Sequence, residues 1–173
     1  MLNIRNIIER VIPENLVALP VTVATYWEES GIRYPLKKNE VFFKRDEIDD
    51  NMLIAQWFTQ KTGRPVQLQP IVVNPSKIRT CDFILTDDNT KLELKTITIS
   101  EDEYNPNKNY INKALGNGYG QANCFIIDIT GCPFLRDKVI DDLDIAMGYT
   151  NRKYVTRVYL KYEDELIGIF ERK

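Results

Sequence analysis

The chain has 173 residues, of which 43% are hydrophobic and 28% are charged, and its formal net charge at pH 7 is -2. This composition is that of a globular protein, and the length allows one good hydrophobic core. The acidic balance argues against a protein that coats nucleic acid through bulk charge, but not against an enzyme with a local basic groove. No apolar run reaches the roughly 20 residues that cross a bilayer, and the N-terminus does not have the pattern of a signal peptide.

Histidine is absent from the chain. Its absence excludes Ser-His-Asp and Cys-His catalysis, acid/base catalysis by histidine, and most zinc enzymes. The three cysteines, Cys81, Cys124 and Cys132, are odd in number and lack CxxC spacing, so they predict neither a disulfide framework nor a zinc ribbon. Any metal chemistry must therefore use carboxylates, carbonyl oxygens and water. These ligands suit hard cations such as magnesium or manganese.

The first part of the chain is predicted to be a helical extension. Apolar side chains recur at helical spacing over residues 2–12, and residues 20–27 fit either a short strand or a helical turn. Residues 31–39 are predicted to be a connector, because proline and lysines interrupt any regular pattern there. This connector would separate an N-terminal helical extension or linking segment, residues 1–36, from a main domain of residues 37–173.

Residues 46–61 are predicted to form a helix, because acidic residues fill the first turn and Gly63 follows the end. Residues 65–73 are typical of a strand with an interruption at Pro70, and hence of an edge or irregular strand. The apolar face that we expect on the helix consists of Ile48, Leu53, Ile54, Trp57 and Phe58.

Residues 81–99 contain two β-rich runs around the turn formers at 87–89, and this pattern predicts a hairpin. A polar loop is expected over residues 100–109. A short helix ended by glycines is predicted over residues 110–118, and a buried central strand over residues 124–129.

The last elements are a helix over about residues 134–147 and a hairpin over residues 154–170, with its turn at 163–165. The order of helices and strands predicts an α/β fold, with a mixed central β-sheet flanked by helices.

The central hairpin carries charged side chains in a pattern that indicates catalysis. Side chains alternate along a strand, so Glu93 and Lys95 share one face. If the turn centres on residues 88 and 89, residue 87 pairs with residue 90 and Asp82 falls opposite Lys95. Asp82 would then lie diagonal to Glu93, whereas a slip of one residue would move it to the other face.

Two carboxylates on an apolar strand repel each other unless a cation joins them. A divalent cation held by Asp82 and Glu93 would polarise a phosphoryl oxygen and lower the pKa of bound water, while Lys95 orients that water or stabilises negative charge. Leu94 would add its backbone carbonyl as a ligand. The competing interpretation of Glu-x-Lys on a strand is a solvated face with a cross-strand ion pair.

These residues resemble the PD-(D/E)xK nuclease superfamily, whose core pattern is an Asp, a hairpin turn and then Glu-x-Lys. More narrowly, residues 46–173 look like the C-terminal toxin domains of CdiA and related polymorphic bacterial toxins. Similar domains place a helix with a trailing glycine before the hairpin, here with Ala55 and Gly63. They also end a later helix in a Gln before a core strand, here Gln121. The resemblance implies a restriction-endonuclease-like core.

Two departures from the family pattern bear on the metal ligands. Similar domains often carry a helix glutamate at the position where this chain has Asn51. Asp50 is the ligand that we expect in its place, with Asp49 and Glu47 as alternatives, and the number of bound metals stays open. The proline that usually precedes the first Asp is absent before Asp82, which has no chemical consequence.

Several side chains around the hairpin are candidates for contact with nucleic acid. Gln121 would orient a water or a phosphate, or else cap the junction between helix and strand. The polar loop and the helix after it carry tyrosines that would stack unpaired bases or serve in packing. The tyrosines are Tyr104, Tyr110 and Tyr119, and the candidate phosphate contacts, each with a solvated surface role as the alternative, are Lys113, Lys108, Arg79 and Lys77.

The resemblance implies a metal-dependent endonuclease with magnesium or manganese, acting as a toxin effector in the bacterial cytoplasm of a target cell and neutralised by a cognate immunity protein. RNA, in particular tRNA, is favoured as substrate because the chain lacks the large basic surface that duplex DNA binding favours. The alternatives are a DNA-cleaving nuclease, either a toxin or an enzyme of repair or restriction, and a non-catalytic binding or assembly protein that retains the fold. No membrane association is expected.

Overall fold

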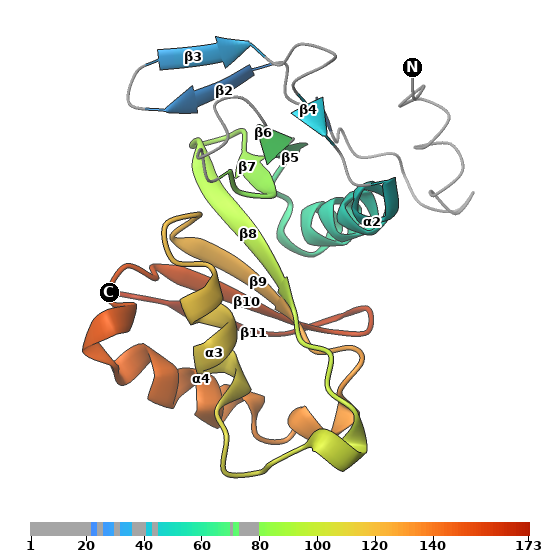
Figure 1. The fold of residues 1–173 in the computed structure, drawn as a ribbon, viewed down its shortest axis with the longest axis vertical. Coiled ribbons are helices and arrows are strands. Elements are labelled where there is room, and N and C mark those ends of the chain that lie inside the picture. Colours follow the sequence, from blue (N-terminus) through green and yellow to red (C-terminus); the bar gives the residue numbers. More distant parts are fainter. Residues whose placement is uncertain are drawn as a thin grey trace. The chain divides into compact units, whose positions relative to one another are not determined.

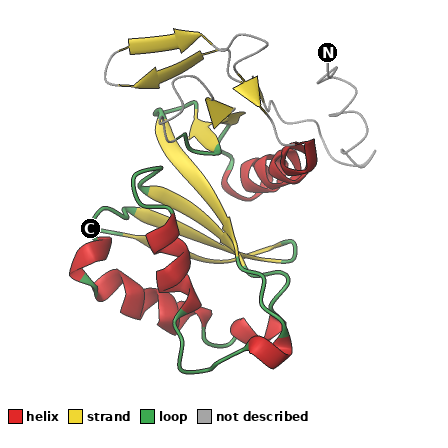
Figure 2. Cartoon of the chain, in the orientation of Figure 1, coloured by secondary structure: helices red, strands yellow, loops and turns green. Residues whose placement is uncertain are grey.

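The structure is a computed structural model, and its elements are shown in Figures 1 and 2. The chain divides into two compact units, which are a first unit of residues 1–90 and a second unit of residues 91–173. The helix predicted over residues 2–12 and the candidates Lys77 and Arg79 lie outside the described residues. The described residues are 22–23, 26–29, 32–35, 41–42, 45–69, 71–72 and 80–173.

The first unit combines one long helix with short strands. In it β1 runs parallel to β5, and β5 runs antiparallel to β7. Two further antiparallel pairs are β2 with β3 and β4 with β6. The elements are β1 (Thr22–Val23), β2 (Tyr26–Glu29), β3 (Ile32–Pro35), β4 (Val41–Phe42), α2 (Arg45–Thr62), β5 (Val66–Leu68), β6 (Ile71–Val72) and β7 (Phe83–Leu85).

Helix α2 confirms the helix predicted over residues 46–61. Gly63 follows it with a φ of 69°, a left-handed conformation that glycine adopts without a steric penalty. Its N–H donates to the carbonyl of Thr59 at 2.8 Å, which caps the helix end. One member of the predicted apolar face is wrong, because Leu53 is 44% exposed. The buried face turns instead through Met52 and Ala55, next to the correctly predicted Ile54, Trp57 and Phe58.

Two predictions for the early strands meet different outcomes. Of the alternatives for residues 20–27, the strand is confirmed in part, by β1 and the start of β2. The connector predicted over residues 31–39 is wrong at β3, which pairs with β2 in antiparallel register. β-branched and aromatic residues favour a strand over Ile32–Pro35, and a proline at a strand end removes no ladder bond from its interior. The interruption expected within residues 65–73 separates β5 from β6.

The turn that follows β7 occupies Thr86–Asn89. Asn89 has a φ of 60°, and its N–H donates to the carbonyl of Leu85 at 2.8 Å. Asp87 lies within this turn, so its predicted pairing with residue 90 is wrong. The turn formers at 87–89 are joined by Thr86, so the turn is longer than the two residues that the prediction assumed.

The second unit is built around β8 (Thr90–Thr96), which begins at the last residue of the first unit. In the second unit β8, β9 and β10 are parallel neighbours, and β11 is antiparallel to β10. The α/β class with a mixed sheet is therefore confirmed. The remaining helices and strands of this unit are α3 (Tyr110–Asn117), β9 (Cys124–Asp128), α4 (Val139–Gly148), β10 (Arg157–Tyr162) and β11 (Glu165–Glu171).

Helices α3 and α4 each connect two parallel strands, and Figure 1 shows them side by side on one face of the sheet. Right-handed crossovers between successive neighbouring strands place both helices on the same face. The core lies between these helices and the sheet, and β9 is buried along its whole length. The residues of this core include Ile111, Leu115, Phe125, Ile127, Leu143, Val158 and Leu160.

Most predicted elements of the second unit are confirmed. α3, β9 and the closing hairpin of β10 and β11 occupy the expected positions. The helix predicted over residues 134–147 begins later than expected, because Pro133–Leu135 forms a separate 3₁₀ helix before α4. Within the described residues, no helix has both the length and the apolar character that crossing a membrane requires.

The turn after β7 supports a prediction about pH. Hydrogen bonds from Thr90 and then Arg64 lower the pKa of Asp88 from 3.8 to about 2, and Arg64 also pairs with Asp87 at 2.8 Å. A carboxyl whose pKa is lower in the folded state stabilises the fold above about pH 4, and this contribution is lost as the pH falls toward 2. Asp88→Asn should therefore lower the free energy of unfolding by about 0.5 kcal/mol near pH 7, as for exposed ion pairs.

The measurement is urea unfolding of the wild type and of Asp88→Asn at pH 7 and near pH 2. The difference between the two proteins should shrink across this window. Asp144→Asn is the matched control, because Asp144 is an exposed carboxylate that forms no ion pair with any described residue. A difference for Asp88→Asn that stayed constant with pH would contradict the electrostatic explanation.

Candidate catalytic site on strand β8

Strand β8 carries Glu93 and Lys95 on the face covered by α3. In the parallel ladder with β9, Glu93 lies beside Phe125 and Lys95 beside Ile127, and both neighbours belong to the core beneath the helices. The Lys95 ammonium lies 2.7 Å from Oε1 of Glu93. The predicted sharing of one face by these two side chains is confirmed by this contact.

The Glu93 side chain is almost completely buried, with a residue exposure of 3%. Removing a carboxylate from water costs several kcal/mol unless a positive charge or hydrogen bonds compensate it. Lys95 supplies that charge and retains 20% side-chain exposure, so its ammonium reaches the edge of the site while the carboxylate lies inside. The pair is therefore a partly desolvated ion pair and not the solvated surface pair that Glu-x-Lys on a strand usually forms.

Lys95 has a second partner in Gln121, whose Oε1 accepts a hydrogen bond from the ammonium at 3.2 Å. The chain segment between α3 and β9 positions this amide. Gln121 donates its backbone N–H to the carbonyl of Gly118 at 3.1 Å, and Gly120 takes a φ of 80° in the same turn. Gln121 was predicted to be a site residue, and its side chain contacts Lys95, another predicted site residue.

Gly118 allows the end of α3 to lie directly on the site. A Cβ at this position would lie 2.3 Å from Cε1 of Phe125 and 3.2 Å from Cε of Lys95. The stem of Lys95 therefore passes beneath a backbone that has no side chain. Sequence reasoning missed the role of Gly118, although a glycine after a helix in the run Gly116–Gly120 signals a close approach of this kind.

A pocket of about 200 Å³ lies beside Lys95, between the carboxyl end of β8 and α3. Lys95 and Lys113 both line it, so two lysine side chains border the same space. Lys113 was predicted to lie at the rim of the site, and its place in the lining of this pocket agrees with that prediction. Lys108 is exposed on the preceding loop and does not line the pocket. The other lining residues are Thr96, Ile97, Thr98, Ile99, Tyr110, Ala114 and Asn117.

The tyrosines proposed for base stacking separate into two groups. Tyr104 and Tyr110 stack on each other with ring centroids 6.1 Å apart, and Tyr104 also packs against Phe134 at 4.6 Å. The hydroxyl of Tyr110 accepts from the N–H of Asn105 at 2.9 Å. Both rings thus have the packing role that the sequence analysis gave as the alternative, whereas Tyr119 is 62% exposed.

The remaining candidate ligands belong to different parts of the chain. Leu94 is in β8, beside Ile126 of β9. Asp82 and Asp50 belong to the first unit, where Asp82 accepts from the N–H of Gln69 at 2.8 Å through its backbone carbonyl and Asp50 is exposed on α2. Their role as ligands stays a prediction. In the described part of the chain, no three acidic, cysteine or histidine side chains lie close enough together to hold a metal ion.

Comparison with known proteins finds no family model, no curated protein and no solved structure that matches this chain.

The packing of Gly118 can be tested by adding a methyl group. Gly118→Ala should lower the free energy of unfolding by about 1–3 kcal/mol, because the new Cβ would collide with the buried Phe125 ring. Gly148→Ala is the matched control, since a Cβ at the end of α4 would meet nothing within 4 Å and alanine favours the helix. Denaturant unfolding measures both. If Gly118→Ala were as stable as the wild type, the end of α3 would not pack against Phe125 as described.

Proposed function

We propose that this chain is a metal-dependent nuclease that hydrolyses phosphodiester bonds, and that Glu93 and Lys95 are its catalytic residues. The observation that carries the proposal is the buried Glu93 carboxylate in contact with Lys95, whose ammonium is shared with Gln121. The neighbouring pocket adds a second lysine, Lys113. The resemblance to the PD-(D/E)xK superfamily includes the same Glu-x-Lys pair. We therefore propose that the α/β fold contains the restriction-endonuclease-like core of that superfamily.

A purely structural role explains this arrangement less well than a catalytic one. Buried ion pairs are weak stabilisers, because the cost of removing two charges from water cancels most of their attraction. Apolar side chains at 93 and 95 would fit the core formed by Phe125 and Ile127 at least as well. A charged pair that reaches the edge of a pocket is typical of sites where the charges act on a ligand.

The donor atoms on β8 fit a hard divalent cation. Glu93 offers a carboxylate and Leu94 a backbone carbonyl, and magnesium or manganese completes its shell with water and with oxygens of the substrate. When bound, such a cation would polarise the phosphoryl group and lower the pKa of a water molecule. We propose Asp82 and Asp50 as further ligands.

Lys95 would act on the substrate directly, and Gln121 would act by positioning Lys95. The Lys95 ammonium donates to both Glu93 and Gln121, and these acceptors hold it at a defined position. A third donor hydrogen of the ammonium would bond a non-bridging phosphate oxygen and stabilise the negative charge that develops there. Lys113 would bind a phosphate from the other side of the pocket.

We propose RNA, in particular tRNA, as the substrate, and a toxin that acts in the cytoplasm of a bacterial target cell as the biological role. The resemblance to CdiA-type toxin domains supports this role, and it implies a cognate immunity protein. The net charge of -2 supports RNA over duplex DNA, because the chain has no bulk positive charge with which to cover a duplex.

The test is incubation of the purified protein with total tRNA and with plasmid DNA, in magnesium, manganese or EDTA. Wild-type protein should degrade RNA in either metal and not in EDTA. Glu93→Gln and Lys95→Met should each lower the rate by roughly 10²–10³-fold, as expected for loss of one charge-stabilising group. Asp82→Asn, tested in parallel, should be similarly impaired if Asp82 is a ligand.

Lys173→Ala serves as the control for removing a lysine, and thermal unfolding verifies that every variant is folded. If the protein cleaved plasmid DNA and not RNA, the proposed substrate would be wrong and the proposed nuclease activity would stand. Equal rates for wild type, Glu93→Gln and Lys95→Met would falsify the site. A folded wild-type protein that cleaves neither substrate would favour a non-catalytic binding protein.

A further inference from the structure

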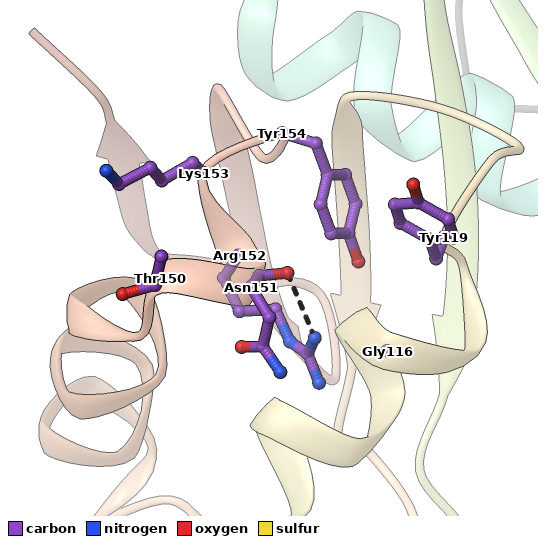
Figure 3. A pocket seen from close by; sticks show the side chains of 7 residues that line it. All are labelled: Gly116, Tyr119, Thr150, Asn151, Arg152, Lys153 and Tyr154. Atoms are coloured by element: carbon purple, nitrogen blue, oxygen red, sulfur yellow. Dashed lines mark hydrogen bonds between the residues drawn. The ribbon is translucent and has the colours of Figure 1, made fainter.

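A second pocket, of about 650 Å³, opens between the end of α3 and the segment that follows α4 (Figure 3). Its volume is within the roughly 300–1,000 Å³ of sites that bind small ligands. The residues on the α4 side were not predicted to be site residues. The lining residues are Gly116, Tyr119, Thr150, Asn151, Arg152, Lys153 and Tyr154.

Two tyrosines form an aromatic wall of this pocket. Figure 3 shows the rings of Tyr119 and Tyr154 next to each other, and their centroids are 5.0 Å apart at an angle of 81°. The Tyr154 hydroxyl donates to the carbonyl of Leu115 at 2.5 Å, and its ring also meets Phe125 of the core edge-on. Burial raises the pKa of Tyr154, which favours the protonated phenol that donates this hydrogen bond. Tyr154 thus packs against the ring of Tyr119, which is 62% exposed.

Arg152 and Lys153 give the pocket positive charge. The Arg152 guanidinium donates to the carbonyls of Asn112 at 3.1 Å and Asn151 at 3.2 Å, while its buried Nε has no hydrogen-bond partner among the described residues. Neither Arg152 nor Lys153 forms an ion pair with a carboxylate in the parts of the chain that the structure describes. Gly116 gives the guanidinium room, because a Cβ there would lie 2.7 Å from Nη2.

The end of α3 separates this pocket from the Lys95 site. Gly116 and Tyr119 line the second pocket, whereas Asn117 lines the pocket beside Lys95 and Gln121 contacts Lys95 itself. Tyr119 and Gln121 are two residues apart, so their Cα atoms lie within about 7 Å of each other. A strand of nucleic acid could therefore reach both places with adjacent nucleotides.

We propose that this second pocket binds one unpaired nucleotide of the strand that is cleaved, with its base stacked on Tyr119 and its phosphate at Arg152 and Lys153. This inference rests on the proposed nuclease function. Aromatic rings beside cationic side chains are the combination that binds single-stranded nucleic acid. A base within a duplex is stacked on its neighbours and cannot stack on Tyr119, so the pocket selects an unpaired nucleotide.

The binding test uses a fluorescein-labelled single-stranded RNA of 12 nucleotides, the DNA of the same sequence and the corresponding RNA duplex. Fluorescence anisotropy is measured in EDTA, where metal-dependent cleavage does not occur. Tyr119→Ala should weaken binding of the single strands by about 5- to 100-fold, which is the range for loss of one stacked base. Tyr119→Phe, which keeps the ring, should bind like the wild type. A second control is Tyr149→Ala, since Tyr149 is also exposed but does not line the pocket.

The salt dependence tests the phosphate contact. Lys153→Ala should lower the slope of log K against log salt by about 0.7, the value for one phosphate contact with a single strand, whereas Lys173→Ala should lower it less. Comparing the RNA and DNA strands shows whether the sugar contributes. Equal binding by Tyr119→Ala and the wild type, or equal binding of the duplex and the single strand, would overturn the inference.

The same proteins separate this inference from the nuclease proposal. A wild-type protein that cleaves RNA while Tyr119→Ala binds the single strand normally would refute the pocket and leave the nuclease intact. A wild-type protein that cleaves nothing, while Tyr119→Ala loses single-strand binding and Tyr119→Phe does not, would support the pocket and refute the nuclease.

Discussion

The buried Glu93 carboxylate is stabilised by a nearby positive charge. The Lys95 ammonium supplies this charge and lies 2.7 Å from Oε1 of Glu93. Residues around the pair hold this contact in place. Gly118 has no side chain, so the stem of Lys95 passes beneath the end of α3, and Gln121 accepts the second hydrogen bond of the ammonium. Because each partner restricts the others, Glu93, Gly118 and Gln121 together fix the position of the Lys95 ammonium.

The end of α3 gives the two pockets a common wall. Gly116 and Tyr119 at this end line one pocket, and Asn117 lines the other. A change in the pitch of this end of α3 would therefore move groups in both pockets together. This shared wall explains why two glycines occur within three residues here, since the backbone must approach both Phe125 and the Arg152 guanidinium closely.

Elements with strong local signals could be predicted from the sequence, whereas long-range contacts could not. The acidic first turn and Gly63 mark α2, and the buried strand β9 follows from its apolar run. The exposure of Leu53 was missed because spacing gives the width of an apolar face but not its direction. Arg152 shows no local signal, because its partner Asn112 is 40 residues away. The Glu93–Lys95 pair was predictable because alternation along one strand brings the two together.

The parallel arrangement of β8, β9 and β10 also affects when the site can form during protein synthesis. Each parallel neighbour must wait for its connecting helix, and β10 follows β8 along the chain by more than half of the second unit. At roughly 5–20 residues per second, the ribosome completes β10 seconds after β8. Until then the core beneath Glu93 lacks Val158 and Leu160. A nascent chain would therefore carry Glu93 and Lys95 before the core that holds the pair in place is complete.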